Sequence, residues 1–281
     1  MIPVTYRGPL LVGYCLDVLL YGILTVQTYL YYIAFPNDKK TTKAIVGFVY
    51  IIDTTQTILA LYDFYQLFCV SKDLAEVVAK FGFMWLTIPL SSSLIATVAQ
   101  LFYAHRIYIL SRKKAVTVIV ILLALTQLSF GLTSAAYFHT NATLANAISS
   151  LLGAVLWGAA GMTCDLVIAV YMSWFLTIQM KRSSRTTQVL LTRIKRRLLE
   201  TGLLTAAMAT AYPLLGYLVT NAFTVPGLSL GKIYSNSILV LLNNRFTIAG
   251  GRNEPDIEFE ADSYRLTDLP RRESVEHGIQ E

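Results

Sequence analysis

Four aspartates lie inside long apolar stretches of the sequence, and their carboxyl groups are its first candidates for chemistry. A carboxylate within the hydrocarbon of a membrane is costly unless it is paired, protonated or hydrated, so such residues are candidate ligand or ion sites. The alternative is that they join helices through hydrogen bonds, and the sequence leaves both roles open. The four are Asp17, Asp53, Asp63 and Asp165.

The spacing of the polar residues around Asp53 indicates one polar helix face. Asp53 and Asp63 are ten residues apart, which on a helix places them within about 80° of each other and about 15 Å apart along the axis. Gln56 falls between them on the same side. We expect this face to line the interior of a bundle, together with Asp17 and Asn236 from other helices. For the two amides we favour helix contacts over ligand binding.

The remaining reactive residue types show no arrangement typical of catalysis. The three histidines are scattered, and the sequence has no HExxH, GxSxG or P-loop pattern. The cysteines lie in or beside apolar stretches without CxxC or Cys/His spacing, as small buried hydrophobic residues do. We therefore expect a protein that is not an enzyme, with no catalytic residue, no metal site and no cofactor.

The elements that must position the polar residues are membrane-spanning helices. Of the 281 residues, 55% are hydrophobic and 14% charged, whereas about a quarter of the residues in a soluble domain are charged. The apolar residues form blocks of about 20 or more, the length that crosses a bilayer. The fold class is therefore all-α, a polytopic integral membrane protein. Seven helices are predicted, over residues 10–34, 44–70, 86–110, 115–138, 147–178, 198–223 and 230–244.

The composition divides the chain into two parts near residue 245. Residues 1–245 form the predicted seven-helix bundle, in which Val225-Pro226-Gly227 is expected to separate the sixth helix from the seventh. Residues 246–281 are polar and charged, which predicts a disordered cytoplasmic tail.

The positions of lysine and arginine predict the orientation of the helices. Of the 23 basic residues, nineteen fall on one side of the predicted helices. Because basic residues gather on the cytoplasmic side, we expect the N-terminus outside and the C-terminus in the cytoplasm. The one glycosylation sequon, at Asn141, then lies in an outer loop and is a candidate for modification. The four basic residues on the outer side are Arg7, Lys72, Lys80 and Lys232.

The net charge of +6 arises in the short loops between helices, where it favours contact with the lipid bilayer and not with nucleic acid. In the basic loop 181–197, Arg196 and Arg197 precede Glu200 by four and three residues, which predicts an ion pair at the membrane interface. This loop and the tail are also the expected contacts for a cytoplasmic partner.

Four short stretches stand out in the second half of the chain: CDLVIA (164–169), ETGLLT (200–205), GKIYSNSIL (231–239) and LNNR (242–245). They resemble the DUF6534 family, a fungal group of seven-helix membrane proteins of unknown function. The similarity is strongest over residues 165–245, and stretches 29–38 and 100–111 are similar to the N-terminal halves of the same proteins. The resemblance implies the fold and a membrane location, and it brings no activity.

Three functions remain open from the sequence. A receptor-like protein that senses an external small molecule fits the helix number, the orientation and the polar tail, and we favour it. A transporter coupled to protons or cations fits the intramembrane acids, although no internal repeat is visible. A membrane scaffold fits the basic loops. We expect the plasma membrane or another membrane of the secretory pathway.

Overall fold

The computed structural model describes residues 4–70, 82–140, 147–181, 185–218 and 222–244, and in this part of the chain all regular structure is helical. Helices satisfy every backbone hydrogen bond within one segment, which long apolar sequences need when no water is present. The elements are α1 (Val4–Ala34), α2 (Lys40–Tyr65), η1 (Gln66–Val70), η2 (Leu86–Leu90), α4 (Ser91–Ser111), α5 (Lys114–Thr140), α6 (Ala147–Met180), α7 (Arg185–Leu218) and α8 (Thr224–Asn243).

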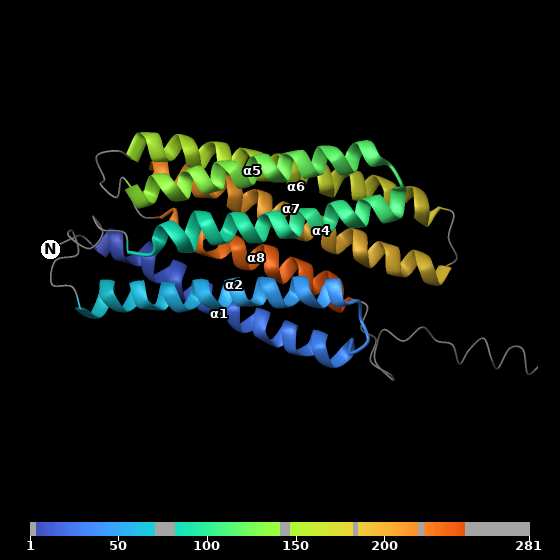
Figure 1. The fold of residues 1–281 in the computed structure, drawn as a ribbon, viewed down its shortest axis with the longest axis horizontal. Coiled ribbons are helices and arrows are strands. Elements are labelled where there is room, and N and C mark those ends of the chain that lie inside the picture. The colour runs from blue at the N-terminus through green and yellow to red at the C-terminus, as the bar shows by residue number, and fades with distance from the viewer. Residues whose placement is uncertain (1–3, 71–81, 141–146, 182–184, 219–221, 245–281) are drawn as a thin grey trace, which may run out of the picture. The chain divides into compact units, whose positions relative to one another are not determined.

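The described residues contain seven helices that are long and apolar enough to cross a membrane, which confirms the predicted number. The π-helical turn η1 continues α2, and η2 leads into α4. Pro89 lies inside η2, where its missing N–H removes one hydrogen bond of a regular α-helix. Figure 1 shows successive helices lying side by side and running in opposite directions.

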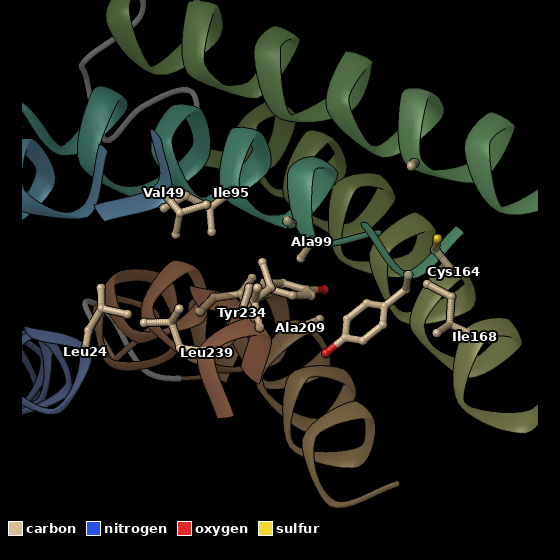
Figure 2. Close-up of a cluster of buried hydrophobic side chains, with 14 of the residues drawn as sticks. Leu24, Val49, Ile95, Ala99, Cys164, Ile168, Ala209, Tyr234 and Leu239 are labelled. Carbon is tan, nitrogen blue, oxygen red and sulfur yellow. The ribbon is translucent and has the colours of Figure 1, made fainter. Parts of the chain in front are cut away.

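Helix α8 is the centre of the arrangement. In its apolar span 83% of the residues are buried, compared with 22% in α5. It packs against α1, α2, α4, α7 and η2. Figure 2 shows Leu239 of α8 near Leu24 of α1, and Tyr234 of α8 near Ala99 of α4 and Ala209 of α7. Large apolar side chains such as Val170 and Tyr217 are instead exposed, as lipid-facing side chains would be.

Two glycines allow helices to approach closely. A Cβ atom at Gly158 of α6 would lie 2.7 Å from the carbonyl oxygen of Ala209 on α7, closer than real Cβ atoms come. A Cβ atom at Gly13 of α1 would lie 3.1 Å from the carbonyl oxygen of Thr224 on α8. Small residues at such positions are typical of helix contacts in membranes, because there packing drives association.

Two asparagines of α8 hold it parallel to α1. Asn236 donates from Nδ2 to the carbonyl oxygen of Leu20 at 3.3 Å, and Asn243 donates to that of Gln27 at 2.9 Å. The pairs are seven residues apart on both helices, so the two helices run in the same direction. Asn236 therefore makes a hydrogen bond between α8 and α1.

The last helix begins earlier than the sequence predicts. The expected break at Val225-Pro226-Gly227 lies within the first turn of α8, which has 20 residues and starts at Thr224. Proline is tolerated there because the first N–H groups of a helix have no partner within it. The prediction of a seventh helix over 230–244 was wrong at its start.

The basic segment before the sixth predicted helix is largely helical. Helix α7 begins at Arg185 and has 34 residues, so most of the predicted loop 181–197 extends the helix beyond its apolar span. The predicted tail, residues 246–281, lies outside the described residues, as does Asn141.

Candidate functional site

Lys232 is the centre of the most highly charged buried site in the described part of the chain. Because α8 begins at Thr224, this lysine lies within the helix and not in the outer loop that the sequence predicts. Its side chain is fully buried. Its Nζ lies 3.3 Å from Oδ1 of Asp17 on α1 and 3.2 Å from Oδ1 of Asp53 on α2.

The Lys232 ammonium has further partners on α2 and α1. It donates to the backbone carbonyl oxygen of Asp53 at 3.0 Å and to Oε1 of Gln56 at 3.2 Å. It also lies 5.7 Å from the ring centroid of Tyr21, where the electron-rich ring face attracts a cation. A buried charge is tolerated only when it is paired and hydrogen-bonded in this way.

Ser235 completes this group, which we call the lysine cluster: Asp17, Asp53, Gln56, Lys232 and Ser235. The Ser235 hydroxyl donates to Oδ2 of Asp53. The cluster has two carboxylates and one ammonium, so its net charge is −1 when all three are ionised. Oδ2 of Asp17 has no hydrogen-bond partner among the described residues. The sequence identifies Asp17, Asp53 and Gln56 as candidates, and the structure brings them together.

A second polar group surrounds Asp165 of α6, and we call it the Asp165 cluster: Gln100, Gln127, Asp165 and Tyr234. The Tyr234 hydroxyl of α8 donates to Oδ2 of Asp165 at 2.5 Å, and Gln100 of α4 donates to Oδ1 at 3.1 Å. Gln100 also donates to Oε1 of Gln127 on α5 at 2.6 Å. Figure 2 shows the Tyr234 side chain pointing toward the part of α6 that carries Cys164 and Ile168.

The two clusters share α8 and differ in charge. Tyr234 and Ser235 are neighbours in sequence, and they reach Asp165 and Asp53 respectively. Within the described part of the chain, Asp165 forms no ion pair with lysine or arginine. Helix α8 therefore connects a charged cluster at α1 and α2 with a cluster at α4, α5 and α6 whose carboxyl group, Asp165, pairs with no lysine or arginine among the described residues.

Asp63 belongs to neither cluster. Its two carboxylate oxygens accept from the backbone N–H of Phe83 at 3.2 and 3.0 Å. The preceding residue, Gly82, has a positive φ of 24°, and a Cβ atom there would collide with the Asp63 carboxylate. Asp63 thus fixes the backbone before η2, although the sequence places it on one polar face with Asp53.

The predicted interfacial ion pair forms on the exposed surface of α7. Nε of Arg196 lies 2.7 Å from Oε1 of Glu200, and these side chains are 79% and 44% exposed. The side chain of Arg197, the other predicted partner, lies outside the described residues.

Sequence reasoning missed Lys232, Ser235, Gln127 and Tyr234. For Lys232 a signal was present, because a helix over 230–244 is too short to cross a bilayer and the missing turn had to lie before it. Tyr234 carries no such signal, since tyrosines are common in apolar helices of this chain. In the described part of the chain, no three His, Cys, Asp or Glu side chains gather where they could hold a metal ion.

Only the second half of the two clusters lies in a stretch that matches a known protein family. No curated protein and no solved structure matches the chain. The matched family model spans Asp165, Lys232 and Tyr234, whereas Asp17 and Asp53 lie before it. The resemblance seen in the sequence is confirmed: residues 161–247 match the model of DUF6534, a family of unknown function.

Proposed function

We propose that this protein is a receptor-like seven-helix membrane protein, not an enzyme, which senses an external small molecule and passes the signal through α8. The observation that carries the proposal is the attachment of the buried Lys232 to Asp17 and Asp53. These contacts hold the central helix to α1 and α2 through a few discrete ionic bonds. Such bonds can be made or broken together, which suits a helix that switches between two discrete positions.

The proposed orientation has the N-terminus outside and the C-terminus in the cytoplasm, in the plasma membrane or another secretory-pathway membrane. Because Lys232 lies within α8 and not in an outer loop, the outer side has only three basic residues, Arg7, Lys72 and Lys80, against nineteen on the other side. Lys232 is then about 12 Å from the outer end of α8. The basic start of α7 projects from the opposite end, where a cytoplasmic partner could bind it.

The charge of the lysine cluster favours a second candidate, a proton-coupled transporter. Two carboxylates face one ammonium, and Oδ2 of Asp17 has no hydrogen-bond partner among the described residues. A single bound proton would neutralise the excess charge. A proton that binds and leaves this position could drive transport.

Proton flux separates the two candidates. The purified full chain is reconstituted in liposomes that contain a pH-sensitive dye, and a potassium diffusion potential is applied. If the protein is a receptor, the internal pH should change at the same rate as in protein-free liposomes. Proton entry that Asp17→Asn abolishes and Asp63→Asn preserves would favour the transporter and contradict the receptor.

Movement of α8 tests the receptor directly. Spin labels are placed at Lys40, at the start of α2, and at Asn244, after α8, in a chain whose native cysteines are replaced by serine. The Lys232→Met variant should change the distribution of distances between the labels, because α8 loses its ionic contacts. Asp63→Asn, which lies outside the cluster, should not. Identical distributions in all three proteins would contradict the proposal.

A further inference from the structure

A small cavity lies beside Asp165 and apart from the lysine cluster. Its volume is about 20 Å³, enough for one particle the size of a water molecule. It lies among α4, α6, α7 and α8. The polar side chains that line it are Tyr103, Asp165, Thr201, Thr205, Tyr234 and Ser237.

Every one of these polar side chains presents oxygen. Several of the hydroxyl groups already donate their hydrogen to another group. Thr205 donates to the carbonyl oxygen of Gly202 at 3.1 Å, and Ser237 donates to that of Ile233 at 2.7 Å. Tyr234 donates to Asp165. Each of these oxygens therefore has lone pairs and no hydrogen left to offer to an occupant of the cavity.

The Asp165 carboxylate adds negative charge to the same wall. Its described hydrogen-bond partners, Gln100, Tyr234 and Thr205, are all neutral. An ionised carboxylate has about four acceptor positions, so about one position remains for another partner. Lys232 does not supply one, because its ammonium is bound to Asp17 and Asp53.

We propose that the cavity beside Asp165 binds one monovalent cation, Na⁺, through the carboxylate and the hydroxyl oxygens of Thr205, Tyr234 and Ser237. Hard cations prefer oxygen ligands, and one carboxylate balances a single positive charge. The cavity has room for either Na⁺ or K⁺, but Na⁺ is the smaller ion and can approach the oxygens more closely, which strengthens the attraction. The ion would connect α6, α7 and α8, and the inference stands independently of the proposed receptor function.

The test is thermal unfolding of the purified full chain in detergent, at constant ionic strength, as NaCl replaces choline chloride or KCl. The Tm should rise with the Na⁺ concentration and saturate, because an ion that binds only the folded state stabilises it. KCl should give a smaller rise. Asp165→Asn should abolish the dependence on Na⁺, and the matched control Asp63→Asn should retain it.

Two milder variants keep the proposal testable if Asp165→Asn does not fold. Ser237→Ala and Thr205→Val each remove one hydroxyl and leave the carboxylate, so half-saturation should need about tenfold more Na⁺. A wild-type Tm that does not distinguish Na⁺ from choline would overturn the proposal. A response that persists unchanged in Asp165→Asn, or that is lost only in Asp17→Asn, would place the ion elsewhere and also overturn it.

Discussion

Lys232 binds Asp53 twice, through the carboxylate at 3.2 Å and through the backbone carbonyl of the same residue at 3.0 Å. The second contact involves a part of Asp53 that no substitution of its side chain removes. Asp17, in contrast, reaches Lys232 only through its carboxylate, at 3.3 Å. The contact of Lys232 with α2 therefore depends less on the Asp53 side chain than its contact with α1 depends on the Asp17 side chain.

Replacement of Lys232 should be strongly destabilising. Lys232→Met leaves two buried carboxylates without their cation, and the loss of one partner from a buried ion pair costs about 3–5 kcal/mol. The free energy of unfolding is measured in mixed micelles of mild and denaturing detergent. The neutral triple variant Asp17→Asn, Asp53→Asn and Lys232→Met should lose less than Lys232→Met alone. An equal or larger loss in the triple variant would contradict the ionic explanation.

The exposed pair on α7 should behave in the opposite way. Arg196 and Glu200 are largely in contact with solvent, and exposed ion pairs contribute at most about 1 kcal/mol. Glu200→Gln should therefore change the free energy of unfolding by less than about 0.5 kcal/mol. The same detergent titration measures it, and a loss comparable to that of Lys232→Met would show that the pair is not solvated as described.

A methyl group at Gly158 should separate α6 from α7. Gly158→Ala places a carbon against the backbone oxygen of Ala209, which cannot move without its helix, and overpacking of this kind costs about 1–3 kcal/mol. Gly22 of α1 is the matched control, because nothing lies within 4 Å of a Cβ atom there. Gly22→Ala should leave the unfolding midpoint unchanged or raise it slightly. Equal effects of both substitutions would argue against the close contact.

The two asparagines of α8 should contribute independently to its contact with α1. Asn236→Leu and Asn243→Leu each remove one hydrogen bond to α1, worth about 0.6 kcal/mol inside a membrane. The positions are about 10 Å apart along the helix, so the losses in the double variant should add. A double variant far less stable than this sum would show that the two contacts are cooperative.

Glycosylation mapping should give opposite results for the two ends of the chain. Acceptor sequons added before α1 should be modified in microsomes, and those added within 246–281 should not, because the basic residues predict a cytoplasmic C-terminus. The natural sequon at Asn141 should be removed first. A modified C-terminal sequon would reverse the orientation and with it the receptor-like argument.

The number of helices was predictable because each apolar stretch has to satisfy its own backbone, whatever lies beside it. The boundaries of the helices were less predictable than their number. Pro226 marks a break in most sequence contexts, yet in the first turn of α8 it costs little. That single boundary decided whether Lys232 was a loop residue or the partner of Asp17 and Asp53.

The partners within the site were less predictable than its members. Asp53 and Asp63 share a helix face in the sequence, but Asp63 binds the backbone of Phe83. Tyr234 and Asp165 are 69 residues apart, and their contact depends on how α6 and α8 are rotated about their axes. The rotation of α6 is constrained by close contacts such as that of Gly158 with α7, which periodicity in one helix does not reveal.

The position of Lys232 on the last helix also affects how the molecule is made. Ribosomes produce the chain from its N-terminus, so Asp53 is synthesised 179 residues before the lysine that neutralises it. Until α8 arrives, α1 and α2 carry acids that lipid does not tolerate, and a protein-lined translocation channel is a better place for them. A chain cut short before α8 therefore leaves Asp17 and Asp53 without Lys232, so these acids acquire their cation only when the last helix is in place.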